Sequence, residues 1–267
     1  MTRTPFTFGV ALTPRANALD WGRVQALLDL TLATVRAQTD PDWRLIVAGH
    51  ERPRLPADRR ITFAGVDWPV QPPGPHNDDS GRKKHLINDC VLEAGGGLLM
   101  LLDADDWADR RTVEASRTAL TGEAVGGLIE TGWAVDARTL RAAALPDARL
   151  FEGGYHRLCG SSTVAVLRPE ADDPVRRDPF THLRSHHQWT EAAGALGVEL
   201  ASLPVEGGYL VNTGENHSDL YGPHASWRRG FIAAVNRHGR PLDRALAARF
   251  GLTVEQAAAA CAEPVAG

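Results

Sequence analysis

An apolar run passes directly into an acidic turn in residues 97–106, GLLMLLDADD. All the residues from Leu98 to Leu102 are apolar, which is typical of a strand buried on both faces of a parallel sheet. Ligands of such sheets bind outside the carboxyl ends of the strands. We therefore expect Asp103, Asp105 and Asp106, which follow this strand directly, to lie at a binding site.

Strand and helix patterns alternate over about the first 120 residues. Apolar residues at helical spacing in residues 24–38 predict a helix, and Pro41 prevents its continuation. The expected strands are 6–12, 43–48, 61–66 and 98–102, and the expected helices are 24–38, 82–94 and 109–120. This order predicts an α/β fold with a mostly parallel, Rossmann-like sheet and helices on both faces.

The second half of the chain has a less regular pattern. We expect strands at 124–136, 162–167, 199–203 and 209–211, and helices at 187–196, 226–235 and 242–250. The alanine-rich residues after Glu255 carry little pattern. No internal repeat or linker is evident, so the two halves are expected to belong to one domain.

Composition excludes several classes of protein. The 267 residues are 43% hydrophobic and 23% charged, which permits a sizeable core. The formal net charge of −4 argues against a nucleic-acid partner. Three distant cysteines argue against a disulfide framework or a cysteine-ligated zinc. No signal peptide or membrane span is evident, so we expect a soluble, cytoplasmic protein, with peripheral membrane association left open.

The acidic turn has two interpretations. Carboxylates this close raise each other's pKa unless a cation lies among them, and Mg²⁺ or Mn²⁺ takes such oxygen ligands. A metal held by one or two carboxylates keeps open positions for a substrate diphosphate. The alternative is that Asp105 or Asp106 caps the helix expected near Asp109, with the other carboxylates solvated.

Two further segments extend the acidic turn into a longer pattern. Residues 38–47 read QTDPDWRLIV, and Asn88, Ala94 and Gly96 precede LDADD at residues 102–106. Over residues 6–120 the chain resembles glycosyltransferase family 2, in which Q-T-x-P-x-W/F-E-x-I-V is followed by N-x-G, A-x-G-x-Y and L-D-A-D-D. Asn88 lies fifteen residues before Asp103, in agreement with that family's spacing.

The resemblance implies a GT-A (nucleotide-diphospho-sugar transferase) fold, a nucleotide-sugar donor and a divalent metal, Mn²⁺ or Mg²⁺. It makes residues 1–120 the nucleotide-sugar-binding half, and residues 121–267 the acceptor-binding half with the C-terminal helices. By match to the DxD motif, Asp103 would approach the ribose or the metal, and Asp105 would bind the metal. Asp106 would support both.

Cations and a late histidine complete the expected donor site. Arg82, Lys83 and Lys84 lie where the family contacts the donor, and their charges suit a diphosphate. His217 stands where many GT-A enzymes carry a histidine that ligates the metal or the diphosphate. A solvated helix start and an ordinary surface histidine are the respective alternatives.

The sequence departs from the family at two points. Residues 49–52, GHER, replace Asp-Asp-Gly-Ser, whose first aspartate contacts the base, and Glu51 is the candidate substitute. The Glu-Asp motif of inverting members, which supplies the catalytic base, aligns with Ser185-His186. A histidine with a pKa of about 6.5 is a workable base. The candidates are His186, then His187, with Asp178 and Glu191 as acidic alternatives; the two histidines could instead bind acceptor or only pack.

The acceptor side is assigned with fewer signals. Gly160 and Ser161 lie in the region that lines it in the family, where small residues let a sugar approach the backbone. Trp107 and Trp189 could stack on sugars, although aromatic side chains more often fill the core.

Three functions remain in competition. The leading hypothesis is an inverting, hexosyltransferase-like enzyme of polysaccharide biosynthesis with a glycan or lipid-linked acceptor. A sugar nucleotidyltransferase would need a glycine-rich loop after the first strand, and residues 13–17, TPRAN, disfavour it. A non-catalytic nucleotide- or glycan-binding relative would explain the missing acidic residues, but the intact Asp103-Ala104-Asp105 argues against it.

Overall fold

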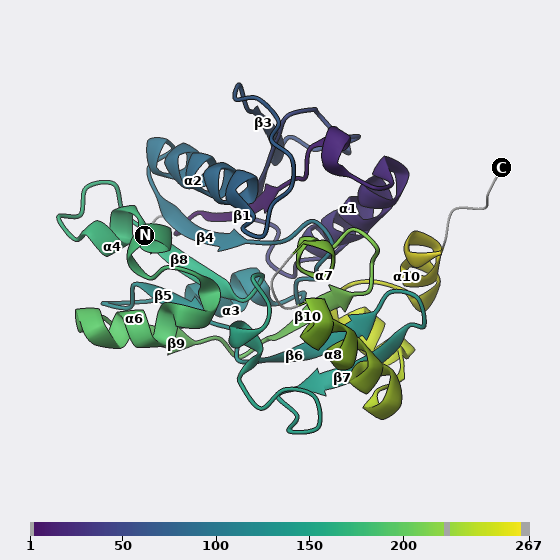
Figure 1. The fold of residues 1–267 in the computed structure, drawn as a ribbon. Coiled ribbons are helices and arrows are strands. Elements are labelled where there is room, and N and C mark those ends of the chain that lie inside the picture. The colour runs from purple at the N-terminus through teal and green to yellow at the C-terminus, as the bar shows by residue number, and fades with distance from the viewer. Residues whose placement is uncertain (1–2, 222–224, 263–267) are drawn as a thin grey trace.

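Two β-sheets form the framework of the chain, which a computed structural model describes over residues 3–221 and 225–262 (Figure 1). Over these residues, the larger sheet has seven strands in the order β3-β2-β1-β4-β8-β5-β9, and β8 alone runs antiparallel to its neighbours. Its strands are β1 Phe6–Ala11, β2 Arg44–Gly49, β3 Ile61–Gly65, β4 Gly97–Leu101, β5 Gly126–Leu128, β8 Thr163–Leu167 and β9 Leu200–Ser202.

Helices cover both faces of this sheet. On one face, α1 and α3 pack against inward side chains of β1 such as Phe6 and Phe8. On the other face, α2 and α6 pack against Leu99 and Leu101 of β4. The helices are α1 Trp21–Arg36, α2 Asp78–Glu93, α3 Thr112–Ala119, α4 Pro174–Arg177, α5 Pro179–His182 and α6 Trp189–Leu196. The predicted α/β class, with a mostly parallel sheet between helices, is confirmed.

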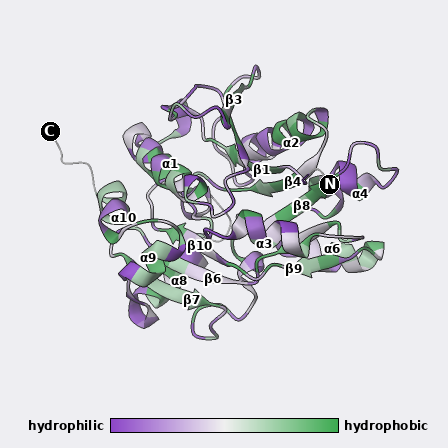
Figure 2. Ribbon diagram, turned by 180° about the vertical axis from the view of Figure 1, so that it is seen from behind, coloured by the Kyte–Doolittle hydropathy of each residue, from purple (hydrophilic) through white to green (hydrophobic). Residues whose placement is uncertain are grey.

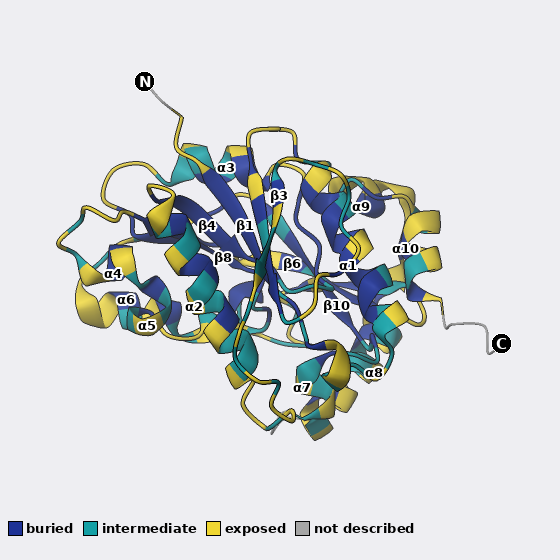
Figure 3. Cartoon of the chain, turned by 90° about the horizontal axis from the view of Figure 1, so that it is seen from above, coloured by how far each residue is buried: buried dark blue, intermediate teal, exposed yellow. Residues whose placement is uncertain are grey.

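The central strands are buried because they are covered on both sides. Every residue of β4 and β8 is buried, as Figure 3 shows in dark blue, and Figure 2 shows the same strands as mostly hydrophobic. The register places Phe8 of β1 opposite both Leu45 of β2 and Met100 of β4. The apolar run of residues 98–102 therefore forms the predicted buried strand.

The turn between α2 and β4 depends on glycine. Gly96 has a φ of 79°, in the left-handed region that favours glycine. A Cβ on Gly96 would lie 2.5 Å from the carbonyl oxygen of Leu167, so there is no space for a side chain at position 96. The predicted end of the helix at residues 95–97 is confirmed.

A second sheet, of four strands within the described residues, lies beside the first in the order β10-β6-β7-β11. Its strands are β6 Thr131–Asp136, β7 Arg141–Leu145, β10 Glu206–Val211 and β11 Arg240–Pro241. The remaining helices are α7 His217–Leu220, α8 Ala225–His238, α9 Arg244–Arg249 and α10 Val254–Cys261, and short 3₁₀ turns are η1 Arg15–Asn17, η2 Tyr155–Arg157 and η3 His186–Gln188.

The prediction of one strand over residues 124–136 is wrong. The chain leaves the large sheet after β5 and enters the second sheet at β6, so the segment serves two sheets. Between them, Ile129 N donates to Ser162 O, and Glu130 O accepts from Tyr155 N. These bonds turn the chain from one sheet toward the other.

The acidic turn joins the two sheets. Trp107 N donates to Gly208 O at 2.8 Å, and Gly208 N donates to Trp107 O at 3.0 Å, so the segment after β4 is paired with β10. Trp107 itself is 1% exposed and packs on Phe250, with 5.6 Å between ring centroids. The turn at residues 103–106 is therefore fixed at both ends.

The described residues contain neither a membrane-spanning helix nor a disulfide. No helix in residues 3–221 and 225–262 is long and apolar enough to cross a membrane. Cys90, Cys159 and Cys261 are all free thiols in this part of the chain.

Candidate active site

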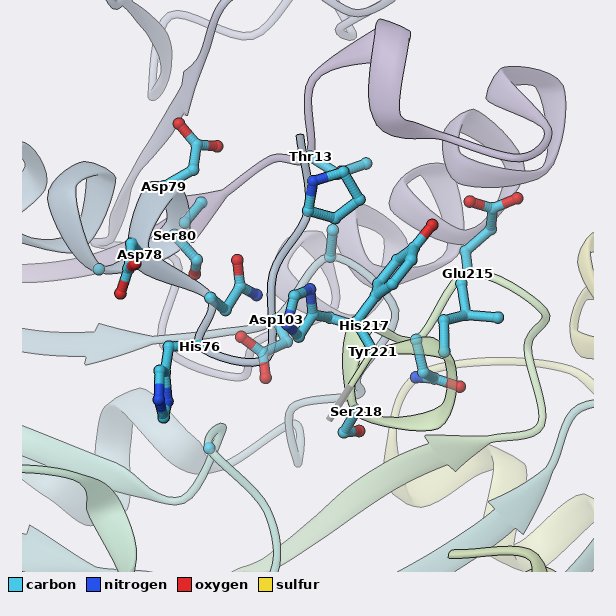
Figure 4. Close-up of a pocket in the computed structure, with 18 of the residues that line it drawn as sticks. Thr13, His76, Asp78, Asp79, Ser80, Asp103, Glu215, His217, Ser218 and Tyr221 are labelled. Carbon is cyan, nitrogen blue, oxygen red and sulfur yellow. The ribbon is translucent and has the colours of Figure 1, made fainter. Parts of the chain in front are cut away.

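A cleft of about 1120 Å³ opens at the carboxyl ends of β1 and β4. The first half of the chain contributes residues 11–14, 68–82 in part, Lys84 and 103–105 to its walls. The second half contributes residues around 157–160, 185–187 and 215–221. Figure 4 shows Asp103 between Asp79 and Ser80 of α2 on one side and His217 and Tyr221 on the other.

Asp106 lies behind the cleft and holds the acidic turn. Its side chain is fully buried, and Oδ1 accepts from Leu210 N at 3.1 Å. Oδ2 accepts from Ser161 Oγ at 2.6 Å and from Cys159 Sγ at 3.3 Å. Burial, with the charge of Asp103, raises the pKa of Asp106 to about 7. Asp106 is thus a structural support for the turn.

Asp105 and Asp103 face the cleft. Asp105 Oδ2 accepts from Asn216 Nδ2 at 2.7 Å, which orients the carboxylate. Burial, and then the charges of Asp106 and Asp103, raise the pKa of Asp105 well above its usual range. Asp103 Oδ1 lies 3.6 Å from Lys84 Nζ. The site therefore concentrates negative charge that a second cation would stabilise.

The donor set fits a hard divalent cation in part. Asp103 and Asp105 offer carboxylate oxygens, and Mg²⁺ is usually bound by one or two carboxylates with water and phosphate oxygens. The described residues contain no group of three His, Cys, Asp or Glu side chains that could hold a metal alone. His217 lines the same cleft, and its Nε2 has no partner among the described residues. Burial lowers the pKa of His217, which keeps the imidazole neutral.

His186 and Gly160 border the space above Asp103. A Cβ on Gly160 would lie 3.1 Å from Asp103 Oδ2 and 3.7 Å from His186 Nδ1, so the absent side chain leaves both groups open to one volume. Burial, and then the charges of Lys84 and His187, lower the pKa of His186 to about 4. His187 also lines the cleft and is exposed. Both histidines are therefore in reach of a ligand.

The other two candidate bases do not line the cleft. Asp178 caps α5 by accepting from Thr181 N at 3.0 Å, and it lies 3.7 Å from His85. Glu191 is exposed and pairs with Arg157 at 2.5 Å. Neither carboxylate is part of the cleft wall, although Arg157, the partner of Glu191, does line it.

Three predicted acceptor residues lie in the core instead. Trp107 and Trp189 are each 1% exposed, so neither ring has a free face for a sugar. Trp189 packs on Phe180 in the layer below the large sheet. Ser161 is 2% exposed, and its hydroxyl is used by Asp106 and Asp103 N. Of the predicted acceptor residues, Gly160 alone lines the cleft.

The predicted donor contacts are also divided. Arg82 and Lys84 line the cleft, whereas Lys83 is fully buried and donates to Leu12 O at 2.7 Å. Glu51 accepts from Arg15 N at 3.1 Å and is not part of the cleft wall. Lys83 and Glu51 therefore have structural partners in place of a ligand.

Sequence reasoning missed several residues of the cleft. Asn216 orients Asp105 from 111 residues away, and Glu215 accepts from Asp20 N across 195 residues. Asp79, in the first turn of α2, and Trp68, in the segment before that helix, also line the cleft. Their polar contacts join distant segments, so no local pattern identifies them.

The fold and the cleft define an α/β protein with an acidic ligand site at the strand ends. No family profile matches the chain, and no curated protein matches its sequence. A solved structure of a proposed nucleotide-diphospho-sugar transferase from Desulfovibrio desulfuricans aligns over 87% of this chain and 97% of its own, with 10% identity and a TM-score of 0.38. An active-site variant of LgtC aligns over 72% of this chain and 64% of its own, with 14% identity and a TM-score of 0.36. These similarities are too distant to transfer residue roles, so function must come from the chemistry of the site.

Proposed function

We propose that this chain is a metal-assisted glycosyltransferase of the GT-A type that uses a nucleotide-diphosphate sugar. The observation that carries the proposal is the position of Asp103 and Asp105 at the carboxyl end of β4, on the wall of a cleft of about 1120 Å³. Both carboxylates remain partly exposed while Asp106 is buried behind them. A cleft of this size has room for an extended donor together with an acceptor.

Asp103 and Asp105 would hold Mn²⁺ or Mg²⁺, which neutralises charge on the leaving nucleoside diphosphate. Lys84, close to Asp103, adds a second positive charge for the same phosphates. Arg82 and His217 reach the cleft from α2 and α7. The two cations Arg82 and Lys84, next to two carboxylates, support a diphosphate as the ligand, and the neutral imidazole of His217 can bind the metal.

His186 is the proposed base. Its low pKa keeps the imidazole neutral at physiological pH, so it can accept the proton of an acceptor hydroxyl. The acceptor oxygen then bonds to the anomeric carbon as the bond from that carbon to the diphosphate oxygen breaks, with inversion of configuration. An imidazole with a pKa of about 4 is a weak base, so stabilisation of the leaving group has to supply much of the rate.

The two halves of the chain divide the substrates in this proposal. The carboxylates and cations of residues 1–120 serve the donor, while Gly160 and His186 of residues 121–267 serve the acceptor. The acceptor is a glycan or a lipid-linked sugar with a free hydroxyl. A protein that binds nucleotide but releases no sugar would instead be the non-catalytic relative.

The test is a thermal-shift series with UDP, GDP, CDP and dTDP, with and without Mn²⁺. Ligands that bind only the folded state raise its apparent stability by mass action. We expect a Mn²⁺-dependent shift with at least one nucleotide, lost in Asp105→Asn and kept in Glu93→Gln, an exposed change of equal charge on α2. No shift with any nucleotide in the wild-type protein would refute the proposal.

A further inference from the structure

Asp79 presents a further carboxylate to the cleft, apart from the acidic turn. It lies in the first turn of α2, five residues before Lys84, which is about 7.5 Å along a helix axis. Asp79 is one of the cleft-lining residues, and its side chain is 21% exposed. Since Lys84 approaches Asp103, Asp79 belongs to a different part of the same cavity.

Both oxygens of Asp79 are fixed by the protein. Oδ1 accepts from Trp68 Nε1 at 3.0 Å, and Oδ2 accepts from Lys83 Nζ. Lys83 is fully buried and also donates to Leu12 O at the end of β1. A carboxylate has about four acceptor positions, so the Asp79 carboxylate keeps acceptor capacity toward the cleft. A ligand donor would therefore meet a carboxylate that is already oriented.

The buried ion pair is costly for a purely structural role. Burial lowers the pKa of Lys83, and pairing with Asp79 opposes that effect. Apolar residues of equal volume often give the same or greater stability than a buried ion pair. One consequence of the pair is that the partly exposed Asp79 carboxylate is held in one orientation at the cleft wall.

His50 lies next to Asp79 and is not among the residues that line the cleft. Its side chain is 8% exposed, and neither ring nitrogen has a hydrogen-bond partner in the described residues. Nε2 lies 3.9 Å from Asp79 Oδ1, too far for a hydrogen bond. The Trp68 ring meets His50 edge-on, and Arg82 lies 4.1 Å from the Trp68 centroid. The cleft wall at this point thus combines the flat ring of Trp68 with an oriented carboxylate.

We propose that Asp79 selects the nucleobase of the donor by accepting a hydrogen bond from its ring N–H or exocyclic amine. This inference rests on the proposed function, which places the diphosphate beside Asp103 and Lys84. A carboxylate repels phosphate, so the donor group that meets Asp79 has to be neutral and carry an N–H or O–H. The sugar hydroxyls and the base both meet these conditions, and the flat ring of Trp68, which lines the cleft beside Asp79, favours the planar base.

The experiment measures the affinities of UDP, CDP, GDP, dTDP and ADP by calorimetry in the presence of Mn²⁺. In the wild-type protein we expect one base to bind most tightly. Asp79→Asn should lower the affinity for that nucleotide by about 10- to 100-fold, which is the range for a lost hydrogen bond to a charged group. The affinity for the other nucleotides should fall by about threefold or less. The matched control is Asp89→Asn, an exposed carboxylate of α2 that is not among the cleft-lining residues, and it should keep the wild-type order.

Asp79→Asn leaves Lys83 buried without a counter-charge and could lower stability. The double variant Asp79→Asn/Lys83→Met removes both charges and should show the same selective loss of affinity for the preferred nucleotide. An equal loss of affinity for all five nucleotides, or an unchanged order of affinities, would overturn the role of Asp79 but leave the proposed function standing. Failure of the wild-type protein to bind any nucleotide would overturn the proposed function and this inference with it.

Discussion

Replacing Ser161 with alanine removes the hydroxyl that ties the acidic turn together. Ser161 Oγ donates to Asp106 Oδ2 at 2.6 Å and accepts from Asp103 N at 2.8 Å. A hydrogen bond to a charged group contributes about 1.5–3 kcal/mol, and one between neutral groups about 0.5–1.5 kcal/mol. We therefore expect Ser161→Ala to lower the free energy of unfolding by about 2–4 kcal/mol.

The size of this loss should depend on pH. The hydroxyl of Ser161 lowers the pKa of Asp106 from where burial would place it, because the bond favours the charged carboxylate. Its stabilising effect is present above the Asp106 pKa of about 7 and diminishes as the pH falls through that value. Ser161→Ala should therefore cost more at about pH 8 than at about pH 5.

Urea unfolding at both pH values measures the effect. Ser162→Ala is the matched control, because Ser162 is also fully buried but donates to the Cys159 carbonyl oxygen and contacts no carboxylate. Its loss should be about 1 kcal/mol and independent of pH. A loss for Ser161→Ala below about 1 kcal/mol at both pH values, or a larger loss in acid, would refute the reasoning.

Three further predictions follow from the cleft and the core. His186→Ala should slow metal-dependent release of sugar from the donor by about 100-fold or more, because it removes the proposed base. The loss of rate in acid through the His186 pKa of about 4 should be absent from this variant, whereas a change near pH 7, where Asp106 titrates, should occur in both proteins. An unchanged rate in His186→Ala would exclude His186 as the base. Gly160→Val should reduce donor turnover at least about tenfold with little change in the urea midpoint, because the added side chain enters the space beside Asp103; unchanged turnover would contradict this. Arg117→Met should lower the free energy of unfolding in urea by about 3–5 kcal/mol, because it leaves buried Asp40 without its main partner. Arg3→Met, at an exposed arginine that also pairs with Asp40, should lower it by less than about 1 kcal/mol. Equal losses would contradict the role of Arg117 as the main partner of Asp40.

Local signals account for the part of the fold that the sequence predicts. The apolar residues 98–102 and the helical spacing of residues 24–38 are properties of short segments, and both elements are present. The second sheet lacks such signals. β7 reads RAAAL and β10 reads EGGYLV, and alanine and glycine are uncommon in strands. These strands form because tertiary pairing overrides local preference.

The candidate site divides in the same way. Asp103 and Asp105 follow a recognisable strand, so their place at the strand end could be predicted. An exposed aromatic ring and a core ring have the same local pattern, so the sequence alone does not reveal that Trp107 and Trp189 are buried. Asn216 and Asp79 act through contacts that only the folded chain creates.

The pairing of the acidic turn with β10 limits how the molecule can move. A hinge between the two sheets would break the Trp107–Gly208 pair and the bond from Leu210 N to Asp106. Opening of the cleft should therefore be confined to its rim, in segments such as residues 68–77 and 217–221, which contain no buried residue. The carboxylates of Asp103 and Asp105 then keep the same positions and the same spacing while ligands enter and leave the cleft.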